Sequence, residues 1–279
     1  MEQKYEHIQP NASQYYMERS VDPGSFIALH WHDAIEIISV LEGSLHIETE
    51  REAVDLTAGD LIVLAPNLLH SVLNSEGNTS LLIQIPIQNL LLAAPETQRR
   101  RIYLNSHTQD ARKKAVADKI RDACAEAMTL FESRSFCYAL RLEALMADIL
   151  YTLYTECSEP VEAKNSLDDT KNRERLSQVF QYTQNHYTEP ITLDEIAKML
   201  HLQKNYFCRL FRNATGITYL EYLNTYRLSR LYHDLLHTDL PIHALLEKHG
   251  ITNYPLFRKM FAERFHATPT EIRKQAKRE

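Results

Sequence analysis

The last third of the chain contains the same short pattern twice. Apolar positions of the first copy reappear 49 or 50 residues later in the second, and the matching pairs are Leu193 with Ile242, Ile196 with Leu245, Phe207 with Phe257, and Phe211 with Phe261. In each copy the apolar residues recur at three and four positions, which predicts a short helix, a turn and a second amphipathic helix. This is the pattern of a helix-turn-helix, present over about residues 192–213 and again over 241–264.

The residues that border these helices are of the kinds that start helices. Thr192 and Glu195 predict a capping box, in which the threonine hydroxyl accepts an amide of the first turn and the carboxylate returns to the cap. Thr268 and Glu271 repeat this pair before a last helix. Between the copies, residues 219–236 predict one helix about 27 Å long at ~1.5 Å per residue. Such a spacer would present the two second helices to major-groove segments about 34 Å apart on one face of DNA.

With these motifs the chain resembles the AraC-type transcription regulators. The matching runs are residues 191–202, 207–212, 215–216, 222–223, 226–228 and 257–261, followed by Thr268-Pro269 and Ile272-Arg273. Four places depart from the usual pattern of that family: Leu246 replaces a small residue, Gly250-Ile251 replaces Gly-Phe, His266 replaces Gly, and Pro255 lies in the second reading helix. The resemblance implies a DNA-binding domain over residues 173–279.

The resemblance also implies which residues read DNA. Base edges would be reached from the first two turns of each second helix, by Lys204, Asn205, Cys208 and Arg209 in the first unit and by Tyr254, Arg258 and Lys259 in the second. Arg209 can bond guanine and Asn205 adenine through two hydrogen bonds each, whereas Cys208 and Tyr254 offer weak or apolar contacts. Arg212 and Thr192 are better suited to phosphates. The alternative is that Arg209 and Lys259 only form solvated helix faces.

Residues 1–105 have the pattern of a β domain. Runs that alternate apolar and polar residues, such as residues 44–48, and the apolar run 61–64 predict many short strands, which suggests a small barrel. The spacing of Gly24, His30, His32, Glu36 and Gly43 resembles the first cupin motif, and that of Gly59, Pro66, His70 and Asn74 resembles the second. We therefore expect a cupin-like barrel that binds an effector.

Four polar residues of these motifs form the candidate effector pocket. His30 and His32 share one face of a strand because side chains alternate, and Glu36 has the same parity. In a cupin barrel His70 would come from a neighbouring strand. Three histidines and a carboxylate suit Zn, Fe, Mn or Ni, yet the same residues can line a metal-free pocket. We expect no cofactor and a small polar effector, with a sugar as one candidate, and keep a divalent metal as the alternative.

Residues 106–156 predict two amphipathic helices in an antiparallel hairpin. Two such helices cannot both bury their apolar faces on one small barrel, so we expect this segment to form a homodimer interface that includes Leu145 and Ile149. The polar residues 157–172, which include Pro160, predict a linker to the DNA-binding domain.

Charge and composition narrow the function classes. Residues 173–279 carry 16 Lys and Arg against 11 Asp and Glu, a net charge of +5, whereas residues 1–172 carry −11, which favours a polyanionic partner for the second half. No apolar run reaches about 18 residues and the start of the chain lacks a secretory signal, which predicts a cytoplasmic protein without a membrane span. Four cysteines without a C-x-x-C pair predict reduced thiols and neither disulfides nor a zinc site.

The predicted fold class is α+β with two domains, an N-terminal cupin-like β-barrel with a helical hairpin and a C-terminal all-α double helix-turn-helix. The predicted function is a ligand-responsive, sequence-specific transcription regulator that binds double-stranded DNA as a homodimer and is not an enzyme. A cupin metalloenzyme with a helical appendage is the main alternative, and an adaptor with a decayed helix-turn-helix is the third. An enzyme has no use for two reading helices set one DNA turn apart, which favours the regulator. The sequence does not distinguish an activator from a repressor.

Overall fold

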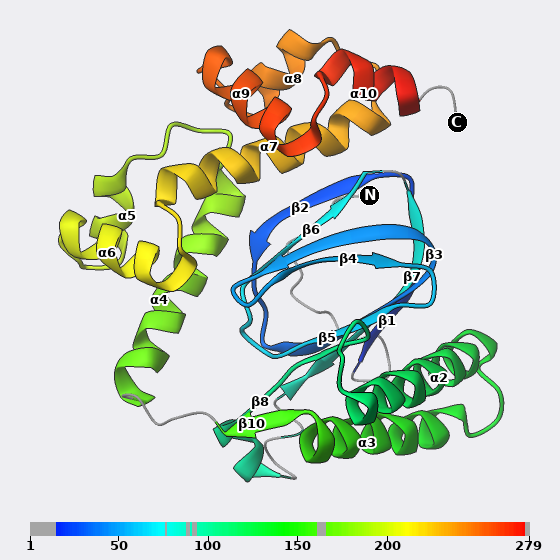
Figure 1. The fold of residues 1–279 in the computed structure, drawn as a ribbon. Coiled ribbons are helices and arrows are strands. Elements are labelled where there is room, and N and C mark those ends of the chain that lie inside the picture. Colours follow the sequence, from blue (N-terminus) through cyan, green and yellow to red (C-terminus); the bar gives the residue numbers. More distant parts are fainter. Residues whose placement is uncertain (1–14, 76, 88–89, 91–93, 161–165, 277–279) are drawn as a thin grey trace. The chain divides into compact units, whose positions relative to one another are not determined.

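The computed structural model describes residues 15–75, 77–87, 90, 94–160 and 166–276 (Figure 1). They form two compact units, a sheet unit within residues 1–22, 31–68 and 76–164, and a helical unit within residues 23–30, 69–75 and 165–279. The predicted α+β class is confirmed, because the first unit is built on an antiparallel sheet and the second is mainly helical. The helical unit also holds two strands, β2 (Ser25–His30) and β6 (His70–Asn74), which lie inside the predicted barrel domain 1–105.

The main sheet of the sheet unit has the strand order β1-β7-β3-β5-β9, and all these pairs are antiparallel. The strands are β1 (Tyr16–Asp22), β3 (Ala34–Thr49), β5 (Leu61–Leu64), β7 (Asn78–Pro86) and β9 (Leu104–Asn105), and β4 (Ala53–Thr57) pairs with the second half of β3. Ile37 of β3 lies opposite Ile83 of β7 and Val63 of β5. All three side chains are buried, so this part of the sheet is the core of the unit.

The segment predicted as a linker contains regular structure. Strand β10 (Ser158–Pro160) pairs antiparallel with β8 (Arg100–Ile102), which follows the short helix η1 (Pro95–Arg99). Helix α4 (Ser166–His186) then begins seven residues before the predicted domain start at 173. Pro160 is compatible with β10 because an edge strand tolerates a residue without an amide hydrogen. Residues 161–165 lie outside the described residues.

Helices α2 (Ala111–Ser133) and α3 (Tyr138–Glu156) form the predicted hairpin (Figure 1). Asp110 caps α2 by accepting the amides of Arg112 and Lys113, and the chain turns after α2 through Arg134 in the left-handed conformation. The expectation that Leu145 and Ile149 lie in an intermolecular interface is wrong. Leu145 is 5% and Ile149 1% exposed, because the two helices bury their apolar stripes against each other and against the sheet of the same unit.

The helical unit contains the two predicted helix-turn-helices. The first reading unit is α5 (Leu193–Met199) with α6 (Lys204–Thr215), and the second is α8 (Ile242–Lys248) with α9 (Tyr254–Phe265). One continuous helix, α7 (Tyr219–His237), joins them, and α10 (Pro269–Ala276) follows the second. The capping box of Thr192 with Glu195 is confirmed. No helix among the described residues combines the length and the apolar character that a membrane span needs.

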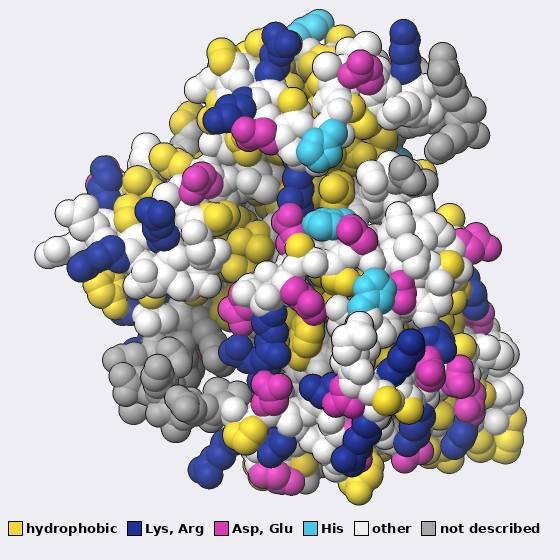
Figure 2. Space-filling view, viewed as in Figure 1, with side chains coloured by type: hydrophobic (Ala, Val, Ile, Leu, Met, Phe, Trp, Pro, Cys, Tyr) yellow, Lys and Arg dark blue, Asp and Glu magenta, His cyan; other side chains and the backbone are white. Residues whose placement is uncertain are grey.

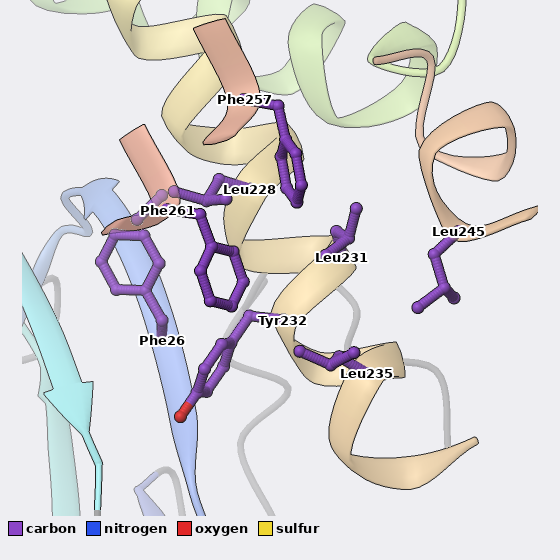
Figure 3. Packing of buried hydrophobic residues seen from close by; sticks show 9 residues of the cluster. Phe26, Leu228, Leu231, Tyr232, Leu235, Leu245, Phe257 and Phe261 are labelled. Carbon is purple, nitrogen blue, oxygen red and sulfur yellow. The ribbon is translucent and has the colours of Figure 1, made fainter. Parts of the chain in front are cut away.

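The two reading units have matching aromatic cores, and α7 contributes to both. Phe207 and Phe211 of α6 pack with Tyr219 at ring-centroid distances of 5.7 and 5.5 Å. The corresponding Phe257 and Phe261 of α9 join a cluster with the second half of α7 (Figure 3). The α7 members of that cluster are Leu228, Leu231, Tyr232 and Leu235. The helix between the reading units is thus a buried part of each core.

Each copy of the repeat turns through the left-handed conformation at the same two places. In the turn between its helices the first copy has His201 (φ 54°) and the second has Gly250 (φ 65°). After the second helix the first copy has Gly216 (φ 76°) and the second has His266 (φ 51°). The replacement of the usual family glycine by His266 therefore leaves the backbone turn in place.

Candidate nucleic-acid interface

Helix α6 separates an apolar face from a polar one. Phe207 and Phe211 are fully buried. Of the predicted base-reading residues, Asn205 and Arg209 lie on the other side of the helix. Lys204, Asn205 and Arg209 are exposed and Cys208 is partly exposed, and the predicted phosphate contact Arg212 is exposed as well. The helix has no acidic residue in its first turn. The exposed residues of the helix therefore offer amide and cationic groups to a ligand, as recognition of base edges and phosphates requires.

Two predicted contacts in the first reading unit are already engaged inside the chain. Lys204 Nζ lies 2.8 Å from Asp194 Oδ2, and this hydrogen bond raises the pKa of the lysine. The Thr192 hydroxyl donates its proton to Glu195 Oε2 at 2.9 Å and accepts the Glu195 amide at 3.2 Å. A phosphate at Thr192 would have to take that proton from the capping box. Thr192 is thus a weaker phosphate donor than its position suggests.

Helix α9 exposes its predicted reading residues at its first two turns. Tyr254 is 50% exposed, Arg258 and Lys259 are exposed, and Lys259 forms only a loose ion pair of 3.8 Å with Glu263. The Arg258 guanidinium lies 6.0 Å from the centre of the Tyr254 ring, within cation–π range. Pro255 is tolerated because it lies in the first turn, where amides have no helical partner. Asn253 caps this turn by accepting the Leu256 amide.

Basic side chains cover part of the surface of the helical unit. Figure 2 shows Lys and Arg side chains gathered over the region of α5 and α6. The sequence places a net charge of +5 on residues 173–279. A surface of this kind attracts a polyanion by releasing its counterions.

A buried polar network in the second reading unit was missed from the sequence. His249, only 2% exposed, lies with Nε2 2.9 Å from Asp234 Oδ2 and with Nδ1 3.3 Å from the Tyr187 hydroxyl. Lys248 Nζ binds the same Asp234 oxygen at 2.6 Å. Burial lowers the pKa of His249, and Lys248 shares the carboxylate that would otherwise raise it. The spacing of the repeat offers a signal for this residue, because His249 stands where the first unit has the apolar Leu200.

We expect the free energy of unfolding to fall as the pH drops from 7 towards 5. The pKa of His249 in the folded chain lies below its ordinary value of 6.5. As the pH falls through 6.5, the unfolded chain therefore binds this proton before the folded chain does, and proton binding favours the unfolded state. His233, whose pKa burial also lowers, acts in the same direction. His249→Leu should reduce this pH dependence in urea unfolding at pH 7 and 5. The exposed His243→Leu serves as control, and an unchanged slope in His249→Leu would contradict the assignment.

Of the four predicted pocket residues, His30 and His70 belong to the helical unit. They are register partners at the end of β2 and the start of β6, and their ring centroids are 4.1 Å apart. His30 Nδ1 lies 3.0 Å from the Ala28 carbonyl oxygen, so a neutral ring donating there keeps its lone pair on Nε2. His70 is buried. The structure therefore brings these two predicted residues together.

His32 and Glu36 belong to the sheet unit and pair with each other. His32 Nε2 lies 2.8 Å from Glu36 Oε2, and the Gln84 amide donates to the same oxygen at 2.7 Å. His32 Nδ1 lies 3.1 Å from the Ala34 carbonyl oxygen. When His32 Nδ1 donates to the Ala34 carbonyl, a hydrogen bond between Nε2 and Glu36 needs a second proton, carried either by the ring or by the carboxyl group. The pair then holds one proton more than neutral His32 with ionised Glu36. A metal at His32 Nε2 would have to displace the Glu36 contact.

Comparisons with known proteins match both halves of the chain. A family described as a helix-turn-helix domain matches residues 196–275, and a cupin-domain family matches residues 17–85. An uncharacterized HTH-type transcriptional regulator of Bacillus subtilis, YdeC, is 22% identical over 255 residues, which cover 89% of this chain and 87% of that protein. An uncharacterized HTH-type transcriptional regulator of Staphylococcus aureus is 21% identical over 235 residues. These residues cover 84% of this chain and 30% of that longer protein.

Solved structures show a similar fold. ToxT of Vibrio cholerae is 12% identical, with a TM-score of 0.52 over 93% of this chain and 96% of that one. ToxT bound to (E)-4-(8-methylnaphthalen-1-yl)but-3-enoic acid has the same TM-score at 13% identity, over 94% of this chain and 98% of that one. Together with the doubled helix-turn-helix, these findings identify the chain as an AraC-type helix-turn-helix transcription regulator with a cupin domain.

Proposed function

We propose that this regulator places α6 and α9 in successive major-groove segments of duplex DNA, and that a small molecule bound by the cupin domain controls this binding. The doubled core carries the proposal. Phe207 with Phe211, and Phe257 with Phe261, anchor the second helix of each copy on α7 and leave its polar face outward. An enzyme would not need this arrangement, and the relatives described as regulators favour DNA binding over catalysis.

The two reading units should differ in specificity. Arg209 and Asn205 of the first unit can each form two hydrogen bonds to a base. The second unit presents Tyr254 and Pro255 in its first turn, and Tyr254 offers mainly an apolar contact, for example to a thymine methyl group. Arg258 and Lys259 add charge. The first segment of the DNA site should therefore show the stronger sequence demand.

Selection from random duplexes by the purified full chain tests the proposal. We expect a site of two segments one helical turn apart, with an affinity that falls steeply with salt because several phosphates are neutralised. Mixed-sequence DNA of equal length is the control. No enriched sequence, or a single enriched segment, would contradict reading by both units.

We assign the effector site to His30, His32, Glu36 and His70. All four lie within the residues matched by the cupin family. The His32–Glu36 contact favours an organic ligand that exchanges hydrogen bonds over a metal that must displace the carboxylate. The ligand of ToxT is a carboxylic acid, so an organic acid joins a sugar as a candidate. Native mass spectrometry should reveal an organic molecule, whereas a stoichiometric metal that His32→Ala removes would overturn this assignment.

A second copy of the chain is the proposed partner of one face of α3. Leu140 and Tyr151 are each 73% exposed, and the exposed Ala144 and Ala147 lie between them on the same helical stripe. Phe136, two residues before α3, is 97% exposed. Exposed apolar patches of this kind mark interaction sites. The two alanines would let an identical helix approach closely across a two-fold axis, as self-association requires. This stripe replaces Leu145 and Ile149 as the proposed interface.

Sedimentation velocity tests the dimer. Leu140→Glu combined with Tyr151→Glu should give monomers, because two carboxylates would be buried against their symmetry mates. Val21→Glu is the matched control, since Val21 of β1 is 76% exposed and lies outside the stripe. If the α3 double variant sediments as the wild-type dimer does, the interface lies elsewhere.

A further inference from the structure

Strand β2 contributes to the core of the second reading unit. Phe26 and Ala28 share one face of β2, and both are at most 5% exposed within the cluster that holds Phe257 and Phe261 of α9. Ile27, on the opposite face, is 41% exposed. Figure 3 shows the Phe26 ring beside those of Phe261 and Tyr232. The hydrophobic core under the second reading helix therefore includes residues from a strand more than 200 positions earlier in the sequence.

Besides its packing on α7, β2 contacts the last turn of α9. The rings of Phe26 and Phe265 meet edge to face, with centroids 5.8 Å apart. The Arg264 guanidinium lies 4.6 Å from the centre of the Phe26 ring, and its Nη2 donates to the Ser71 hydroxyl of β6 at 3.3 Å. Cation–π and edge-to-face contacts have defined geometries, so these interactions fix the direction of the helix end as well as bury it.

This contact leaves the reading surface of α9 open. Tyr254, Arg258 and Lys259 lie in the first two turns and are exposed, whereas Arg264 and Phe265 lie at the other end of a helix of 12 residues. Strand β2 therefore does not block DNA. It holds the end of α9 opposite the reading residues, and a change in this contact would tilt the reading surface.

The same two strands end at the predicted effector residues. His30, four residues after Phe26, is the last residue of β2, and it pairs with His70, the first residue of β6. Four residues of strand span about 13 Å at ~3.3 Å each. The ring centroids of His30 and His70 are 4.1 Å apart, so a ligand that enters between these side chains acts directly on the ends of both strands.

We propose that the β2–β6 pair is the mechanical link between the effector residues and the second reading unit, and that it sets the tilt of α9 without acting on α6. The inference rests on the proposed DNA-binding function and specifies its regulation. Strand β2 packs on the second half of α7, whereas Phe207 and Phe211 of α6 pack on Tyr219 and Tyr222 in its first half, so α6 does not share this link. Effector occupancy thus changes recognition of one DNA segment and leaves the other unaltered.

Hydroxyl-radical footprinting of the full chain on its selected duplex tests the link. Arg264→Ala should weaken protection of the second segment, with a loss of about fivefold or more in affinity, because α9 is no longer held in one orientation. Protection of the first segment should not change. Gln275→Ala, at an exposed position on α10, should behave as wild type, and Arg264→Lys should restore part of the protection by keeping a cation over Phe26. Equal loss over both segments, or no loss, would overturn the proposal.

A double-mutant cycle tests the connection to the effector residues. His30→Ala should alter affinity through the second segment in the wild-type background and should have no such effect in Arg264→Ala, because the link is already broken. Sites that do not communicate give additive effects, so additivity refutes the link. If thermal unfolding shows that Arg264→Ala is misfolded, Phe26→Leu takes its place in the cycle. If random selection yields no DNA site, the proposed function itself fails, which separates that outcome from failure of the link.

Discussion

Arg209→Ala should lower the affinity of the full chain for its selected duplex by about 1–3 kcal/mol and relax the preference at one base pair. Arg209 is exposed on the polar face of α6, one position after Cys208 and on the side opposite Phe207 and Phe211. Loss of its guanidinium would leave a guanine edge without two hydrogen bonds. Binding measured on the selected site and on variants at each base pair checks both effects.

Arg212→Ala is the matched control, since Arg212 is an exposed arginine one turn further along the same helix. A phosphate contact carries no sequence information, so its loss should weaken all duplexes alike and reduce the salt dependence. Should Arg209→Ala weaken specific and mixed-sequence DNA equally, Arg209 would be only another phosphate contact.

Gly250→Ala should destabilise the helical unit much more than the same change at Gly216. Both glycines have positive φ, 65° and 76°, where a residue with a side chain costs about 1–2 kcal/mol. At Gly250 an added Cβ would also lie 2.3 Å from the Thr188 carbonyl oxygen, whereas at Gly216 it would meet nothing within 4 Å. Such overpacking adds about 1–3 kcal/mol.

Urea unfolding of both variants measures the difference, because the shared cost of the backbone conformation cancels between them. Thr188 lies between α4 and α5, so Gly250 is where the turn of the second reading unit meets the segment leading into the first. If the two variants lose equal stability, the close approach at Gly250 contributes nothing.

Local patterns predicted the elements of the DNA-binding half well. The helix at 219–236, both capping boxes and the paired phenylalanines all follow from spacing and from the chemistry of helix starts. These features depend on residues within a few positions of one another. The base contacts stay predictions, since exposure alone does not show what a side chain touches.

Partners distant in the sequence could not be predicted in the same way. Periodicity gave Leu145 and Ile149 an apolar face, but it does not say what covers that face, and the covering surface belongs to the same unit. Likewise, no local pattern indicates that Phe26 would lie beside Arg264 and Phe265, which follow it by more than 230 positions. For Thr192 the capping box was evident in the sequence, yet its effect on the hydroxyl proton was overlooked.

Because α7 enters both reading cores without a break, its length fixes the separation of α6 and α9. This limits how the spacing of the DNA segments can change in evolution. Inserting one residue would turn everything beyond it by about 100° and advance it by ~1.5 Å, which would turn the exposed face of α9 away from that of α6. An insertion of about seven residues, two turns of helix, nearly restores the rotation and adds about 10.5 Å. That length corresponds to roughly three base-pair steps at ~3.4 Å each. A shift of three base pairs also turns the major groove by about 100°. Relatives that keep one unbroken helix here should therefore keep the spacing of their DNA segments, and small changes in that spacing must be absorbed by bending of the DNA.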